Sequence, residues 1–241
     1  MDNEKIVFAA MGKFFATIIM LIAATFFIIG CEKSPTQPEP FQSDSDWVDL
    51  GLPSGLLWAT HNVGATSPED YGDYFAWGET APKSVYDMST YRYGIESGYT
   101  GNIFTKYCSV SYYGYNSFTD NLTILQPGDD AATANYGGRT PTYDEWHELI
   151  DHTTAQWTTQ NDVNGCRFTS SNGNSIFLPA VGYIDGTDSI SVRYFATYWS
   201  SSLDTDIPMH AWRLYFDNGN RQYLDGGSRS EGSAVRAVRQ N

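Results

Sequence analysis

Positive charge is scarce in this chain, which has 14 lysines and arginines against 28 aspartates and glutamates and a formal net charge of −14. A surface of this sign repels phosphate backbones, so we expect no nucleic-acid partner. Cysteine is scarce as well, because the chain has only Cys108 and Cys166 besides Cys31. That pair permits one disulfide, but nothing in the sequence places the two residues close together.

The sequence also lacks the motifs of common catalytic and nucleotide-binding sites. It has no G-x-S-x-G elbow, no P-loop and no G-x-G-x-x-G fingerprint. His147 and His152 stand at positions i and i+5, roughly 140° apart around a helix, whereas a zinc-binding pair needs i and i+4. We therefore expect a protein that is not an enzyme and has no zinc site. A polysaccharide-active enzyme is the less favoured alternative.

The most informative feature that the chain does have is an apolar run, Phe14 to Ile29, which follows Lys5 and Lys13 and leads into Gly30-Cys31. These are the parts of a secretory signal, and the Ile-Ile-Gly-Cys end resembles a bacterial lipobox. We expect residues 1–30 to be a lipoprotein signal peptide and Cys31 to carry acyl chains such as palmitate. The predicted location is the cell envelope, at the outer membrane. A transmembrane helix over the same run is the alternative.

The next segment, residues 31–46, is rich in proline and polar residues and cannot bury an apolar face. We interpret it as a flexible tether. The folded domain is expected over residues 47–241, a length that suits one domain. Its first apolar runs are broken by Gly-Leu-Pro-Ser-Gly, which predicts a turn between two strands.

The strongest helix signal runs from Thr142 to about His152, where Trp146, Leu149 and Ile150 share one face. Thr142 can cap this helix and form a capping box with Glu145. After it the pattern is that of strands, and the hairpin at 211–224 is predicted to turn at Asn218-Gly219. The expected strands are Gly165–Thr169, Ser175–Leu178, Thr197–Ser201, the two arms of that hairpin, and Ser233–Arg239.

Residues 83–119 hold 8 of the 17 tyrosines and show no clear period, so we expect a long, ordered loop region with short strands. In sum, the predicted fold class is α+β, rich in strands and loops, with few helices. No cofactor is required, although structural calcium at Asp129-Asp130 or at Asp204-x-Asp206 is an open alternative. The Asp129-Asp130 pair could equally cap a short helix.

The segment RTPTYDEWHELI resembles the helix start of the formylglycine-generating-enzyme and C-type-lectin-like group. Together with VDLGLPSGLLWATHNVG, NGNSIFLPAVGY, YWSSS and AVRAVR, it resembles the Fibrobacter succinogenes major paralogous domain family of bacterial lipoproteins, from about Trp47 to the C-terminus. The resemblance implies a C-type-lectin-like fold whose first and last strands pair and whose long loop region presents a binding face. It also implies that Trp146, Trp199 and Trp212 lie in the core.

Two departures limit what the resemblance implies about activity. Cys108 and Cys166 do not lie where the sulfatase-activating enzymes carry their reactive cysteines, which argues against an oxidase. The segment Gln126-Pro127-Gly128-Asp129 is similar to a lectin calcium motif, but it precedes the helix rather than following it. The same fold also serves for hypervariable display, and the resemblance implies that residues 198–239 are the segment that would be diversified here.

These features predict a surface-tethered, non-catalytic binding protein whose ligand is a glycan or a protein. An envelope-assembly protein is the main alternative. The residues predicted to bind the ligand are exposed members of the late segment, chosen for aromatic faces, guanidinium donors and polar specificity: Arg193, Tyr194, Asp204, Asp206, Asn218, Asn220, Arg221, Tyr223 and Arg229.

Overall fold

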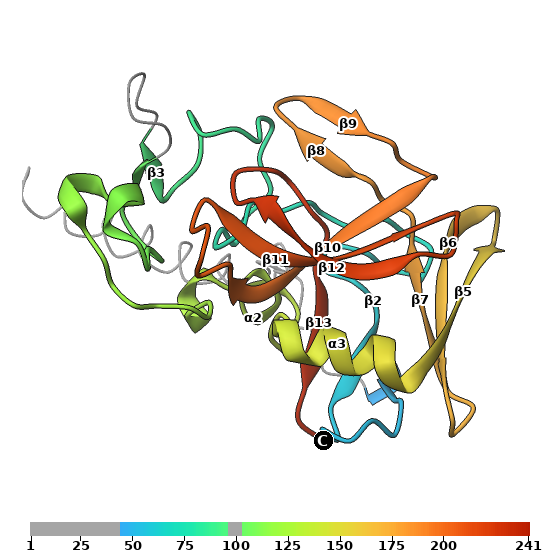
Figure 1. Cartoon of the computed structure of the whole chain (residues 1–241). Coiled ribbons are helices and arrows are strands. Elements are labelled where there is room, and N and C mark those ends of the chain that lie inside the picture. The colour runs from blue at the N-terminus through green and yellow to red at the C-terminus, as the bar shows by residue number, and fades with distance from the viewer. Residues whose placement is uncertain (1–43, 96–102) are drawn as a thin grey trace, which may run out of the picture. The chain divides into compact units, whose positions relative to one another are not determined.

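Strands from the two ends of the domain pair with each other in the computed structural model of the chain, which describes residues 44–95 and 103–241 (Figure 1). β1 (Trp47–Asp49) and β2 (Leu57–Asn62) form an antiparallel hairpin, and β13 (Arg236–Arg239) adds to the other edge of β2. The predicted turn between two early strands and the predicted terminal strand are both confirmed. The described residues all belong to one compact unit, Pro40–Asn241.

A second antiparallel sheet consists of β10 (Phe195–Leu203), β11 (His210–Asp217) and β12 (Gln222–Ser228). The predicted β11–β12 hairpin is confirmed, but its turn is not the two-residue Asn-Gly turn. The last paired residues are Phe216 and Gln222, and Asn220 adopts the left-handed conformation with φ 58°. Asparagine tolerates this conformation well. The turn therefore comprises residues 217–221 rather than Asn218-Gly219 alone.

The third sheet contains β5 (Thr153–Gln160), β6 (Val163–Ser170) and β7 (Ser175–Pro179), all antiparallel. A two-stranded hairpin, β8 (Tyr183–Asp185) and β9 (Asp188–Ile190), follows it. The strands predicted at 165–169 and 175–178 are therefore confirmed. β5, β8 and β9 had no clear sequence signal.

The predicted helix is α3 (Tyr143–His152), and its capping box between Thr142 and Glu145 is present. A shorter helix, α2 (Ala131–Asn135), begins at Asp130, whose side chain accepts a hydrogen bond from the backbone N–H of Ala132. None of the helices within residues 44–95 and 103–241 is both long enough and apolar enough to cross a membrane.

The tyrosine-rich segment between these sheets and helices has little regular structure, as expected. It contains the short strands β3 (Gly94–Ile95) and β4 (Ile103–Phe104). The remaining short elements within the described residues are 3-10 helices: η1 (Asp44–Asp46), η2 (Ser111–Tyr113), η3 (Tyr115–Ser117) and η4 (Pro127–Asp129). The described chain is thus a strand-rich α+β fold with few helices, in agreement with the predicted class.

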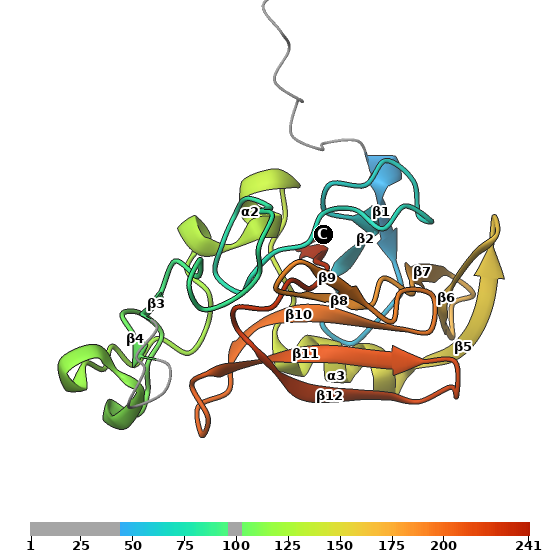
Figure 2. The same cartoon turned by 90° about the horizontal axis from the view of Figure 1, so that it is seen from above.

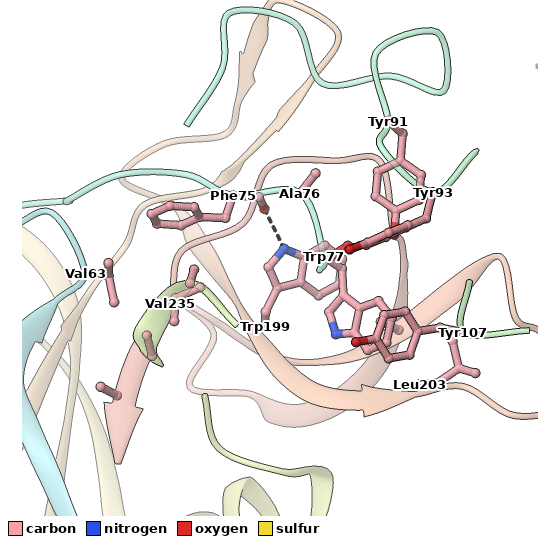
Figure 3. Packing of buried hydrophobic residues seen from close by; sticks show 14 of the residues in the cluster. Val63, Phe75, Ala76, Trp77, Tyr91, Tyr93, Tyr107, Trp199, Leu203 and Val235 are labelled. Atoms are coloured by element: carbon pink, nitrogen blue, oxygen red, sulfur yellow. Dashed lines mark hydrogen bonds between the residues drawn. The ribbon is translucent and has the colours of Figure 1, made fainter. Parts of the chain in front are cut away.

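Aromatic side chains fill two neighbouring parts of the core. In one, the indole N–H of Trp199 donates to the carbonyl of Phe75 at 2.7 Å (Figure 3). The indole N–H of Trp77, in the same part, donates to the backbone carbonyl of Ser200 at 2.8 Å. In the other, the rings of Trp58 and Trp146 lie 4.9 Å apart between α3 and the sheets. Trp146 and Trp199 are core residues as predicted.

The prediction for Trp212 is wrong, because this residue is only half-buried. Its ring lies 4.9 Å from that of Tyr143, at the start of α3. The side chain of Trp212 therefore lies at the edge of the core, between α3 and β11, rather than in its interior.

Candidate ligand-binding face

One face of the β10–β11–β12 sheet carries a row of aromatic rings. The strand register places Tyr215 opposite Tyr223, and their rings stack with centroids 4.7 Å apart. On the other side, Tyr215 stacks on Phe195 at 5.3 Å. Because side chains alternate along a strand, Leu214 and Phe216 point to the opposite face, where α3 covers them. The Tyr215 face is partly covered: Tyr215 and Phe195 are half-buried, and Tyr223 is exposed.

The β8–β9 hairpin extends this row. Figure 2 shows the hairpin beside β10, and an isolated bridge pairs Gly182 with Ala196. This position brings the ring of Tyr183 to 5.9 Å from that of Phe195. We refer to the rings of Tyr183, Phe195, Tyr215 and Tyr223 as the aromatic row. Tyr223 is its most accessible member, with 42% of its surface exposed.

Charged side chains border the aromatic row. The guanidinium group of Arg213 donates to Asp225 Oδ1 at 3.2 Å and to Glu231 Oε2 at 2.9 Å, and it lies 5.4 Å from the centre of the Tyr183 ring. Burial raises the pKa of Glu231 above its ordinary value, although the charge of Arg213 opposes that rise. The two ion pairs of Arg213 hold its hydrogen-bond donors and the carboxylate acceptors of Asp225 and Glu231 in place beside the aromatic rings.

The structure brings six of the nine predicted binding residues together at one end of the sheet. The segment leading into β10 contacts the β11–β12 turn, because the N–H of Asn218 donates to the carbonyl of Tyr194 at 3.1 Å. In the same turn Asp217 bonds the guanidinium of Arg221. The six residues that share this end are Arg193, Tyr194, Asn218, Asn220, Arg221 and Tyr223.

The other three predicted residues do not belong to this end. Asp204 and Asp206 lie in the β10–β11 connection, at the opposite end of β10. Asp204 is buried, and its Oδ1 accepts hydrogen bonds from the backbone N–H groups of Asp206 and Ile207 at 3.1 Å. Its carboxylate therefore forms a turn instead of facing solvent.

The prediction for Arg229 is wrong for a similar reason. Arg229 is completely buried, and its guanidinium group donates to the hydroxyl of Tyr91 and to three backbone carbonyls. A group whose donors are used in this way is not available to an external ligand. Arg229 therefore serves to hold parts of the fold together.

The candidate calcium ligands also have partners within the protein. Asp129 accepts hydrogen bonds from Tyr93, Tyr107 and Lys106, while Asp130 caps α2 and bonds Thr140. Within the described residues, no group of three or more histidine, cysteine, aspartate or glutamate side chains is placed to hold a metal ion.

Sequence reasoning missed most of the aromatic row. The notable omissions are Tyr183, Phe195 and Tyr215, together with the bordering Arg213, Asp225 and Glu231. The available signal was an alternation along one strand, in which Arg213 and Tyr215 alternate with Trp212, Leu214 and Phe216. It identifies two faces of a strand but does not show which face the rest of the protein leaves partly exposed.

Cys108 and Cys166 are both free and buried, and they pack in different parts of the core. The predicted signal peptide, Cys31 and most of the tether lie outside the described residues. Comparison of the chain with protein-family models, with curated proteins and with solved structures finds no match. The family resemblance given above therefore rests on the sequence motifs alone.

Proposed function

We propose that this chain is a lipid-anchored, non-catalytic binding protein of the bacterial cell envelope, and that its aromatic row binds a glycan. The observation that carries the proposal is the stack of Phe195, Tyr215 and Tyr223, which ends in an exposed ring at Tyr223. A C-type-lectin-like fold, as the sequence motifs imply, belongs to the same proposal.

Aromatic faces suit sugars because a sugar ring presents apolar C–H groups on its face and hydroxyl groups around its rim. A stacked tyrosine covers the face, and fixed polar groups nearby satisfy the hydroxyl groups. Here Asp225 and Glu231 supply acceptors and Arg213 supplies donors, all held in place by ion pairs. A row of rings on adjacent strands favours an extended glycan over a single sugar.

The charge around the row narrows the class of glycan. Acidic side chains outnumber basic ones there, with Asp185, Asp217, Asp225 and Glu231 near Arg213 and Arg221. This excess of negative charge disfavours ligands rich in carboxylate or sulfate. We therefore expect neutral or amino sugars to bind in preference to acidic ones.

A glycan array tests the proposal. The soluble chain from residue 32 onward is applied to matched neutral and acidic glycans, in calcium and again with a chelator. Saturable binding to a neutral or amino-sugar class, unchanged by the chelator, supports the proposal. Loss of binding on chelation would show instead that recognition depends on calcium. A blank array from a folded sample would contradict glycan binding and favour a protein partner in the envelope.

Lipid anchoring is tested separately with the full chain in cells. Metabolic labelling with an alkyne-tagged palmitate should mark the native chain and should fail with Cys31→Ser, which removes the acceptor thiol. Fractionation should then show the native protein in the outer membrane. Labelling of Cys31→Ser at the native level would contradict the anchor.

A polysaccharide-active enzyme is the second candidate, because Glu231 has a raised pKa and lies near a second carboxylate, Asp225. Such a pair can serve acid–base cleavage of a glycosidic bond. However, the ion pair with Arg213 favours the charged form of Glu231 and opposes the rise in its pKa, which suits binding better than proton donation. Release of reducing ends that disappears in Glu231→Gln would establish the enzyme instead.

A further inference from the structure

A separate pocket lies away from the aromatic row, next to the sheet of β5, β6 and β7. Its volume is about 120 Å³, and β2, which contributes part of the wall, packs against β7. One side is apolar, with Val48, Ile176 and Phe177. The other side is polar, with Gln160, Arg167 and Ser175. The pocket therefore combines an apolar wall with hydrogen-bonding groups, as small-molecule sites do.

Arg167 is the charged residue of this pocket. Its strand register places it opposite Gln156 on β5 and Phe177 on β7, on the face away from the buried Phe168. Its Nη2 donates to Gln160 Oε1 at 2.7 Å. Within the described residues, no other hydrogen bond and no carboxylate contact joins the guanidinium group to the protein, so its remaining N–H groups are accessible to a ligand.

Arg167 differs in this respect from several other arginines of the chain. Acidic residues outnumber basic ones by two to one, 28 against 14, and Arg139, Arg213 and Arg221 each bond a carboxylate directly. Arg167 is half-buried, so part of its guanidinium group remains accessible beside the apolar residues of the pocket. An anionic ligand in the pocket would pair with this charge.

A neighbouring acid holds the polar side of the pocket in position without neutralising Arg167. The amide nitrogen of Gln160 donates to Glu69 Oε1 at 2.5 Å, and Asn161 donates to the same oxygen at 2.9 Å. This leaves the amide oxygen of Gln160 turned toward Arg167. The guanidinium group is thereby oriented by a neutral side chain, which keeps its positive charge available.

We propose that this pocket binds a small carboxylate with a short apolar body, supplied as a free acid or as the C-terminal residue of a peptide. The carboxylate pairs with the unused nitrogens of Arg167, the geometry for which a guanidinium is suited. The apolar body packs on Val48 and Phe177. The volume suits a branched side chain, because a cavity of about 150 Å³ holds a benzene ring.

The experiment titrates the full chain, by NMR or calorimetry, with isovalerate and with its neutral amide, isovaleramide. The peptide arm uses acetyl-glycyl-leucine and its C-terminal amide. An acid should bind with a dissociation constant on the order of 1 mM, and the matching amide should bind at least tenfold more weakly. The acid that binds more tightly identifies the source of the carboxylate.

Arg167→Gln should lower the affinity for the acid by about tenfold, since it removes the charge but keeps hydrogen-bonding groups. Arg92→Gln, a change of equal charge at a side chain that is 57% exposed, should leave the affinity unchanged. An unchanged unfolding midpoint for Arg167→Gln shows that the variant is folded. Equal binding of acid and amide, native affinity in Arg167→Gln, or no saturable binding of either acid would overturn the proposal.

Discussion

The guanidinium carbon of Arg229 lies 4.3 Å from the centre of the Phe104 ring. The same group donates to the Tyr91 hydroxyl at 3.0 Å and to three carbonyl oxygens, those of Lys106, Tyr107 and Pro208, at 2.9 to 3.0 Å. One buried side chain therefore connects the segment after β12 with the tyrosine-rich segment, from which it is separated by more than a hundred residues.

Arg229→Lys should destabilise the protein by roughly 3 kcal/mol, because an ammonium group cannot reproduce a planar fork with four hydrogen bonds in a buried site. Urea denaturation followed by tryptophan fluorescence measures the change. Arg193→Lys, at an exposed residue, is the matched control and should leave the midpoint unaltered. Equal midpoints for the two variants would show that Arg229 does not hold these segments together.

Asp129 should make the stability depend on pH in the acid range. Burial, the largest single influence, acts to raise its pKa, but hydrogen bonds from Lys106, Tyr107 and Tyr93 hold the pKa of Asp129 below its ordinary value. A carboxyl group with a lowered pKa in the folded state contributes stability above about pH 4, and that contribution is lost as the pH falls further.

Asp129→Asn should therefore cost roughly 2 kcal/mol at neutral pH, because it removes the charge that these donors bond. The difference from the native chain should shrink as the pH falls below about 4, because the unfolded chain takes up a proton at this residue before the folded chain does. Urea midpoints measured across a pH series test this. A difference that stays constant with pH would contradict the role of the Asp129 charge.

Cys108 and Cys166 should behave as buried thiols. Burial raises the pKa of Cys166 to about 12 and also raises the pKa of Cys108, so neither forms a reactive thiolate at neutral pH. A reducing agent should leave the melting temperature unchanged. Alkylation without prior reduction should modify both cysteines in the unfolded chain and neither in the folded one. A Cys108–Cys166 cross-linked peptide in the mass spectrum would contradict this.

The parts of the fold that sequence predicted well are those whose causes are local. Thr142 and Glu145 are three residues apart, and their capping box together with the apolar face at Trp146 and Leu149 is sufficient to define α3. β5 was missed because the stretch TTAQWTTQ is polar with few apolar residues, and its strand is defined by pairing with β6. Pairing of this kind depends on tertiary context.

The same distinction applies to the candidate site. Asn220, Arg221 and Tyr223 could be chosen from sequence because they border a recognisable hairpin. Tyr183 could not, because its place beside Phe195 depends on how the β8–β9 hairpin lies along β10. Arg229 looked like an exposed arginine in a Gly/Ser-rich segment, and its burial depends on Tyr91 and Phe104, which are remote in sequence.

The most direct test of the account is calorimetric titration of the best glycan from the array into the native chain, Tyr223→Ala and Tyr112→Ala. Tyr223 has 42% of its surface exposed within the aromatic row, while Tyr112 is 72% exposed on η2, outside the row. Loss of a stacked ring should weaken binding in Tyr223→Ala by at least about tenfold and leave Tyr112→Ala at the native affinity. Native affinity in Tyr223→Ala, or equal losses in both variants, would contradict glycan binding by the aromatic row.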